Sequence, residues 1–172
     1  MAWAKKNSKP LGDDIIAISR VAMSYVSRRE YAAEELRKKL IERGAEPAAA
    51  KESVDCMVQL RYVDDARFAA AFVRDRREFR PCGEIILRRD LAAKGVSPEI
   101  IDNAIAEEYD ETRQREALHQ LIEKAAASMP EDPAKKRPYV NRVSRRFIGK
   151  GFPQSMVMDE ISCLRNSIED DI

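Results

Sequence analysis

The chain has 172 residues, 44% of them apolar and 35% charged, which allows a buried core beneath a densely ionic surface. Its 6 glycines and 8 prolines are few for a barrel or a sandwich, whereas abundant Ala, Leu, Ile, Glu, Arg and Lys favour helices. The first residues lack the apolar run of a signal peptide, the sequence has no apolar run of about 18 residues, and its 3 scattered cysteines form no disulfide pattern. We therefore expect a cytoplasmic protein with no membrane partner.

The first third of the chain predicts three helices. Asp13 or Asp14 can cap a helix through IIAISRVAMSYVS, whose apolar residues recur at helical spacing. The segment AAEELRKKLIER predicts a second helix that stops at Gly44, because glycine adopts the left-handed conformation of a helix end at little cost. Pro47 suits the first position of a third helix, which runs to about Leu60.

Six further helices are predicted after these. Asp64 caps a helix through ARFAAAFVRDRREF, another spans about 83–94, and Ser97-Pro98-Glu99 starts one that ends near Tyr109. The last third repeats the plan with TRQREALHQLIEKAAAS, KRPYVNRVSRRFIGKG and PQSMVMDEISCLRNSI. The segment MPEDPAKKRP, residues 129–138, is predicted to be a long unstructured linker.

One nine-residue phrase occurs three times, as LRKKLIERG, LRRDLAAKG and VSRRFIGKG, ending at Gly44, Gly95 and Gly151. Around each glycine, apolar residues recur at the same offsets on both flanking helices. Such matching indicates a structural repeat, because one small helical triplet buries too little apolar surface and must pack on its neighbour. We predict an all-α fold of three tandem three-helix repeats in an elongated, curved (right-angled or crescent) array. A flexible N-terminal segment at 1–12 precedes repeats at 13–62, 63–110 and 111–172.

The net charge of +1 hides a segregation of charge along the chain. Residues 135–150 hold seven Lys or Arg and no acid, whereas residues 99–111 hold six acids and no base. Such patches can bind a polyanion in one place and a basic protein surface in another. At about 100° per residue, Lys38, Arg89 and Arg145, each six positions before its glycine, should point to solvent. An ordinary solvated face explains these three cations as well as a binding role does.

A search for catalytic or metal-binding residues finds no convincing site. His119 stands alone on a charged helix, where a solvated histidine is the simpler interpretation. Asp64 and Asp65 open a helix, which favours caps over paired catalytic acids. The sequence around Lys150 lacks the spacing of a phosphate loop, and the cysteines match no zinc pattern. We therefore expect neither an enzyme nor a cofactor.

Three segments resemble the RecX family of recombination regulators: YAAEELRKKLIERG (31–44), RYVDDARFAAAFVRDR (61–76) and LRRDLAAKGVSPEIIDNAI (87–105). The block Tyr62-Val63-Asp64-Asp65, followed by Arg67-Phe68-Ala69, is the most specific. The likeness is clear over 27–106 and weaker, but in register, over 139–161. There are two departures from the pattern. Ala32 stands where the family often has a small hydroxyl cap, and Arg80-Pro81-Cys82-Gly83 stands where a Gly-Pro is usual.

The resemblance implies three helical repeats, no cofactor, and binding to the RecA recombinase filament, with roles in DNA repair and the SOS response. RecX proteins are similar in lodging along the filament groove, restraining strand exchange and limiting filament growth and co-protease activity. We expect a monomer that also binds DNA weakly and without sequence specificity. Acidic helices around Glu107-Glu108 and Asp159-Glu160 could meet basic RecA surface. The cations predicted to contact RecA or DNA are Lys38, Arg74, Arg77, Arg88, Arg89, Arg142, Arg145, Arg146 and Lys150.

Two other functions remain open at this point. Helix pairs joined by a glycine turn can imitate a helix-turn-helix, so a basic DNA-binding protein without a filament partner is the first alternative. Asn, Gln and Arg are not grouped at one helix start, however, so no recognition helix stands out. The second alternative is an adaptor for another protein, against which only the family likeness argues.

Overall fold

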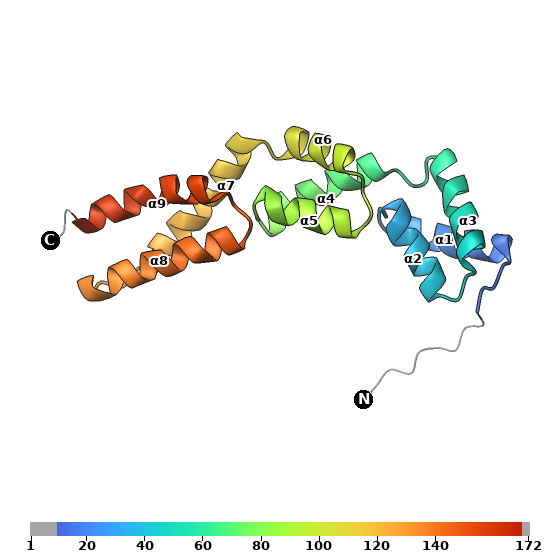
Figure 1. The fold of residues 1–172 in the computed structure, drawn as a ribbon, viewed down its shortest axis with the longest axis horizontal. Coiled ribbons are helices and arrows are strands. Elements are labelled where there is room, and N and C mark those ends of the chain that lie inside the picture. The colour runs from blue at the N-terminus through green and yellow to red at the C-terminus, as the bar shows by residue number, and fades with distance from the viewer. Residues whose placement is uncertain (1–9, 170–172) are drawn as a thin grey trace, which may run out of the picture. The chain divides into compact units, whose positions relative to one another are not determined.

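The computed structural model describes residues 10–169, with side chains described as far as Ser162. Over these residues the chain forms nine helices and no strand, apart from one isolated parallel bridge between Gly12 and Ala45 (Figure 1). The predicted all-α fold of three helical triplets is confirmed. The helices are α1 (Ile15–Val26), α2 (Ala33–Glu42), α3 (Pro47–Gln59), α4 (Asp65–Phe79), α5 (Glu84–Ala93), α6 (Pro98–Glu108), α7 (Glu111–Ala126), α8 (Pro133–Gly149) and α9 (Gln154–Glu169).

The chain divides into two compact units. The first contains the described residues up to Ala69 together with Lys94–Val96, and the second contains Ala70–Ala93 and the chain from Ser97 onward. The division falls inside α4 and so differs from the sequence repeats, whose boundaries at 62/63 and 110/111 stay a prediction. Of the segment expected to be flexible, residues 1–9 lie outside the described part of the chain.

Each unit has a buried apolar core of its own. In the first unit, α1, α2 and α3 enclose a cluster that includes Ile18, Leu36, Leu40 and Val54. In the second unit, α7, α8 and α9 enclose a separate cluster. Figure 1 shows α8 and α9 running side by side after the turn that joins them. The residues of the second cluster are Leu118, Ile122, Ala125, Val140, Val143, Phe147, Phe152, Met156, Val157 and Ile161.

The apolar register predicted around the three glycines is confirmed by burial. Eight residues before each glycine lie Leu36, Leu87 and Val143, and all three are buried. The residues four positions before and ten positions after each glycine are also buried, and they are Leu40, Leu91, Phe147, Val54, Ile105 and Ile161. Equivalent helices therefore present the same face to the core in all three repeats.

The glycine turns have the predicted left-handed conformation. The φ angles of Gly44, Gly95 and Gly151 are 89°, 85° and 85°. After α2, the amide of Gly44 donates to the carbonyl of Ile41, and the amide of Ala45 donates to that of Leu40. These two bonds satisfy carbonyls that the helix end leaves free. The same turn therefore ends α2 and sets the direction in which α3 begins.

The same turns also pack against a neighbouring backbone. A Cβ added to Gly95 would lie 2.4 Å from the Cβ of Glu34, at the start of α2. A Cβ added to Gly83, just before α5, would lie 2.0 Å from the carbonyl oxygen of Gly151. The glycine turn of each later repeat therefore sits on the start of the second helix of the repeat before it.

The first glycine turn is covered by the segment that leads into α1. The amide of Gly12 donates to the carbonyl of Gly44 over 2.8 Å, and the amide of Glu46 donates to the carbonyl of Gly12 over 2.7 Å. Leu11 packs against the core of the first unit. The last residues of the segment expected to be flexible are thus fixed to the α2–α3 turn.

The predicted linker over 129–138 is wrong, because α8 begins at Pro133. The carboxylate of Asp132 accepts a hydrogen bond from the amide of Ala134, and proline suits the first position of a helix. Pro138 lies inside the helix. Proline content suggested a loop, but a cap and a first-turn proline are also the signature of a helix start.

Two adjacent acids cap two different helices. Asp64 accepts a hydrogen bond from the amide of Arg67 and so caps α4, as predicted. Asp65 instead accepts a 2.8 Å hydrogen bond from the amide of Ala33. Ala32 itself forms no side-chain cap at the start of α2. The hydroxyl cap missing from the sequence is therefore replaced by a carboxylate from α4.

We predict that Gly83→Ala destabilises the protein by about 1–3 kcal/mol, because the new methyl group would overlap backbone atoms of the Gly151 turn. Gly149→Ala is the matched control, since nothing lies within 4 Å of a Cβ at this position. Alanine in the last position of α8 should be neutral or stabilising by up to about 1 kcal/mol. Urea unfolding followed by circular dichroism measures both. Equal stabilities of the two variants would contradict the close contact.

Candidate functional site

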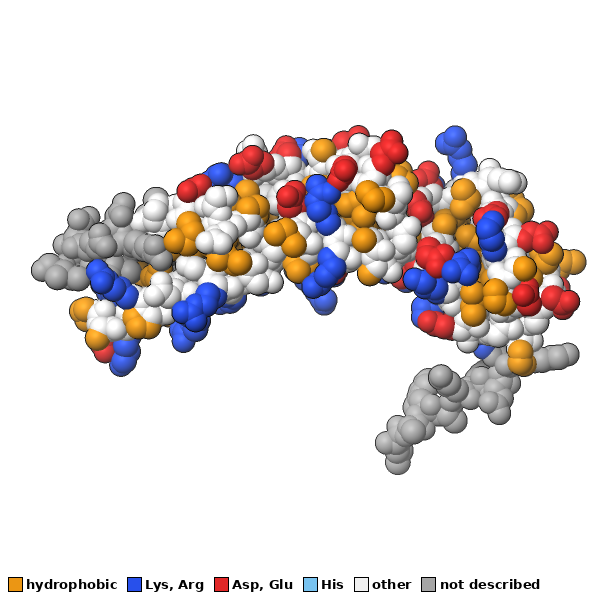
Figure 2. Space-filling view, viewed as in Figure 1, with side chains coloured by type: hydrophobic (Ala, Val, Ile, Leu, Met, Phe, Trp, Pro, Cys, Tyr) orange, Lys and Arg blue, Asp and Glu red, His pale blue; other side chains and the backbone are white. Residues whose placement is uncertain are grey.

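A strip of exposed cations runs along α8. Arg142, Arg146 and Lys150 follow one another at four-residue spacing, which places them on one face of the helix, with Arg145 beside them. The inward side of the helix carries Val140, Val143 and Phe147, which are buried in the core. Figure 2 shows basic side chains gathered over this helix. We call Arg142, Arg145, Arg146 and Lys150 the α8 basic face.

The α8 basic face has no acidic partner among the described residues. No Asp or Glu carboxylate there forms an ion pair with any of its four cations. Arg142 instead lies 5.1 Å from the ring centre of Tyr139, and Arg146 lies 4.7 Å from that of Phe147. The Tyr139 hydroxyl donates to the carbonyl of Ala125, which fixes that ring. The guanidinium groups are thus held on aromatic faces with their charge left for an external anion.

The predicted cations of α4 are already engaged within the second unit. Arg74 pairs with Glu108 over 3.5 Å. Arg77 donates to the backbone carbonyl of the same residue over 2.7 Å. Glu108 is the last residue of α6, so both arginines bind the end of that helix. Arg77 is half-buried there, and its contact to a helix-end carbonyl is structural.

The remaining predicted cations have acidic neighbours as well. Arg88 pairs with Asp102 and Glu84, Arg89 pairs with Asp90, and Lys38 lies 3.8 Å from Glu34. Lys38, Arg89 and Arg145 are all exposed, as their position before the glycine predicted. Exposed pairs contribute little and can be exchanged for other partners. The nine predicted cations therefore separate into four with carboxylate partners, Arg77 with a backbone carbonyl as its partner, and the four of the α8 basic face.

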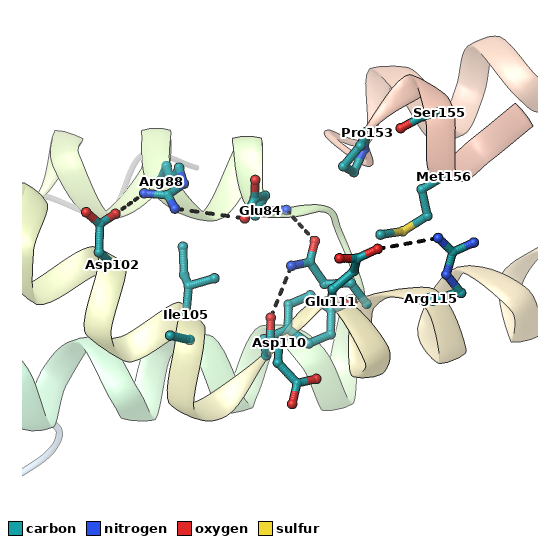
Figure 3. A pocket seen from close by; sticks show the side chains of 13 residues that line it. Glu84, Arg88, Asp102, Ile105, Asp110, Glu111, Arg115, Pro153, Ser155 and Met156 are labelled. Atoms are coloured by element: carbon teal, nitrogen blue, oxygen red, sulfur yellow. Dashed lines mark hydrogen bonds and ion pairs between the residues drawn. The ribbon is translucent and has the colours of Figure 1, made fainter. Parts of the chain in front are cut away.

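The second unit also contains a pocket of about 520 Å³ (Figure 3). Its charged side chains are paired across the opening, with Arg88 between Asp102 and Glu84 and Arg115 bonded to Glu111. The buried Gln114 lies beneath them, accepting from the amide of Glu84 and donating to the carbonyl of Tyr109. Gln114 therefore fastens the start of α5 to the α6–α7 connection, which is a structural role.

Other residue types considered for chemistry do not converge in the described part of the chain. Cys56 is exposed and Cys82 is buried, and both are free thiols. Burial raises the pKa of the Cys82 thiol, which keeps it protonated. Among residues 10–169, no group of three or more His, Cys, Asp or Glu is arranged to hold a metal ion. None of the described helices is long and apolar enough to cross a bilayer.

Comparison with known proteins points to one family. Residues 64–105 match the model of the second three-helix domain of RecX. The regulatory protein RecX of Pseudomonas putida (strain GB-1) is 30% identical over 147 residues, covering 84% of this chain and 89% of that protein. The chain belongs to the RecX family.

Other members agree in sequence or in fold. RecX of Geobacillus kaustophilus (strain HTA426) is 28% identical over 145 residues, but this chain spans only 53% of that longer protein. The crystal structure of RecX from Lactobacillus salivarius superposes with a TM-score of 0.75 at 22% identity, covering 89% of this chain and 97% of that one. The three-helix repeat is therefore the fold of this RecX-family chain as well.

The acidic helices predicted to meet a basic surface are largely occupied internally. Glu160 of α9 accepts from Arg115 and from His119 of α7, and Asp159 lies 3.7 Å from Arg115. Together with the engagement of Glu108 by α4, these pairs tie helices to one another. They are not an open acidic surface comparable to the α8 basic face.

Sequence analysis of the RecX-family pattern missed one ion pair that joins two repeats. Lys94, just before the second glycine, donates to Glu35 of α2 over 2.7 Å, and Glu35 also accepts from Arg29. Burial raises the pKa of Glu35, but the two hydrogen-bonded cations outweigh it and the pKa is lowered. By its position in the sequence, Lys94 is simply a cation near a helix end, where such a charge is favourable. Its partner lies 59 residues away, so no local pattern could identify it.

His119 of α7 is expected to make the stability of the protein depend on pH. Its hydrogen bond to Glu160 and the charge of Glu123 raise the pKa of His119. Because the pKa is raised, protonated His119 stabilises the fold fully at pH values below the pKa of histidine in the unfolded chain, about 6.5. That stabilisation is lost as the pH rises through the higher pKa of His119 in the folded protein.

We therefore predict that the melting temperature of the wild type minus that of His119→Ala falls as the pH rises from about 6 to 8.5. A pH-independent difference would contradict the ion pair.

Proposed function

We propose that this protein regulates the RecA recombinase by binding its filament on DNA, and that it does so without catalysing a reaction. Membership of the RecX family supports a regulatory role, since its relatives carry the name regulatory protein RecX. The observation that carries the choice of site is the α8 basic face. Its four exposed cations lack acidic partners among the described residues, whereas the other predicted cations pair with a carboxylate or, for Arg77, donate to a backbone carbonyl.

The α8 basic face suits contact with nucleic-acid phosphate inside such a filament. Four cations within about two and a half turns of one helix create a local positive potential that attracts a polyanion. Arginine and lysine can contact phosphates whatever the neighbouring base, so we expect that binding by this face does not depend on sequence. Affinity from this face should fall steeply with salt, as expected when phosphates release their counterions.

The direct test measures RecA ATPase activity on single-stranded DNA while the protein is titrated in. We expect the rate to fall at equimolar or lower ratios of protein to RecA. An unchanged rate, with filament binding also absent in a sedimentation assay, would refute the proposed function.

The site is tested by removing charge from two matched sets of arginines and lysines. We predict that replacing Arg142, Arg146 and Lys150 by Ala weakens inhibition at least about tenfold and leaves the helical spectrum unchanged. The control replaces Arg74, Arg88 and Arg89 by Ala, which removes the same charge from residues that have acidic neighbours. The control should weaken inhibition less than about threefold. Equal losses in both sets would show that only total charge matters.

Salt titration gives an independent measurement. For single-stranded DNA, the slope of log affinity against log salt should shrink by about 0.7 for each phosphate contact removed. The α8 triple variant should therefore lose up to about two units of slope, whereas the control set should keep the wild-type slope. A wild-type slope in the α8 variant would rule out phosphate contacts by these residues.

A further inference from the structure

The turn that ends α3 has the same hydrogen bonding as the glycine turns, but with arginine in the glycine position. The amide of Arg61 donates to the carbonyl of Val58, and the amide of Tyr62 donates to that of Met57. Arg61 has a φ of 58° and is the one non-glycine residue with positive φ in the described part of the chain. Glycine adopts this conformation without strain, whereas a side chain does so at a cost. The position therefore holds an arginine where the backbone would favour glycine.

The residues around Arg61 are apolar and exposed. Leu60 is 62% exposed and Tyr62 is 48% exposed, and Val58 is exposed as well. Arg61 is exposed beside them. Large side chains at one turn thus remain outside both cores. Arg and Tyr are the types enriched where protein interfaces gain most of their binding energy, and Leu60 adds apolar surface beside them. We call residues 58–62 the α3 tip.

The α3 tip is held rigidly from below. Arg67 donates to the carbonyl of Arg61 and to that of Tyr62. The guanidinium of Arg67 is fixed in turn by two hydrogen bonds to Glu30, of 2.8 and 3.0 Å. A strained turn kept in one geometry by this support loses little conformational entropy when it binds, which favours association.

The charge on the tip favours a protein partner over nucleic acid. Arg61 is a single cation among aliphatic and aromatic side chains, whereas nucleic-acid interfaces are densely positive. None of the described carboxylates forms an ion pair with Arg61. Two acids close to it in the sequence have other partners, since Asp55 pairs with Lys51 and Asp64 caps α4. A partner that complements the tip would offer an apolar depression with a carboxylate at its edge.

We propose that the α3 tip is a protein-docking site, which seats Leu60 and Tyr62 in an apolar depression of the partner and pairs Arg61 with a carboxylate there. The identity of the partner rests on the proposed function: it is the protein surface of the recombinase filament. The tip then differs in role from the α8 basic face, since one contacts protein and the other contacts phosphate.

Two tip variants test this proposal against two controls in sedimentation with RecA filaments and in binding to bare single-stranded DNA. Arg61→Gly removes the side chain and relieves the backbone strain, so its melting temperature should equal or exceed that of the wild type. Leu60→Ser changes an exposed side chain and should leave the melting temperature unchanged. Arg20→Ala and Ile85→Ser are the controls, because both residues are exposed and lie away from the turn in sequence.

We expect both tip variants to bind filaments at least about fivefold more weakly, and both controls to bind within about twofold of the wild type. Binding to bare DNA should be unchanged in all four, which separates the tip from the α8 basic face. The proposal is overturned if Leu60→Ser binds filaments as tightly as the wild type, whatever the stability of Arg61→Gly. It is also overturned if the control variants lose as much filament affinity as the tip variants. If the wild type itself fails to bind filaments, the proposed function falls, and the partner assigned to the tip falls with it.

Discussion

The left-handed glycine at the end of each second helix is the constraint on which the repeat depends. At Gly44 and Gly151 it closes a helix hairpin with two backbone hydrogen bonds, and at Gly95 and Gly151 its missing side chain leaves room for a close neighbour. Gly95 sits against Glu34, and Gly83 lies against Gly151. A side chain at Gly83 would overlap the facing turn, and one at Gly95 would press on Glu34 in a strained backbone conformation. The same residue type therefore serves helix termination and repeat stacking, for two separate physical reasons.

The surroundings of the three glycine turns are not identical. Gly12 and Leu11 cover the turn between α2 and α3. Helix α8 begins about two turns earlier, relative to its glycine, than α2 and α5 do. This longer helix is also the one that carries the basic face.

Charge in this protein has two uses that composition cannot separate. Pairs such as Arg77 with the end of α6, or Lys94 with Glu35, join helices that are distant in sequence. Arg142 and Arg146 of the α8 basic face stack on aromatic rings, and none of the four cations of this face pairs with a carboxylate among the described residues. The α3 tip adds a third kind of surface, a strained turn with exposed apolar side chains. In the regulatory function proposed for this RecX-family chain, the α8 basic face contacts phosphate and the α3 tip contacts protein.

The sequence by itself determined the helices, the repeat and its register, because these depend on local periodicity, caps and glycine. Leu36, Leu87 and Val143 could be assigned to the core from their offset alone. The tertiary structure decided which cations are engaged across helices, because Glu108 and Asp102, which pair with Arg74 and Arg88, lie in another helix that no spacing rule reaches. It also revealed that Asp65 caps α2 and that Arg61 takes a glycine conformation. Contacts between distant segments are chosen by packing, which a local pattern does not encode.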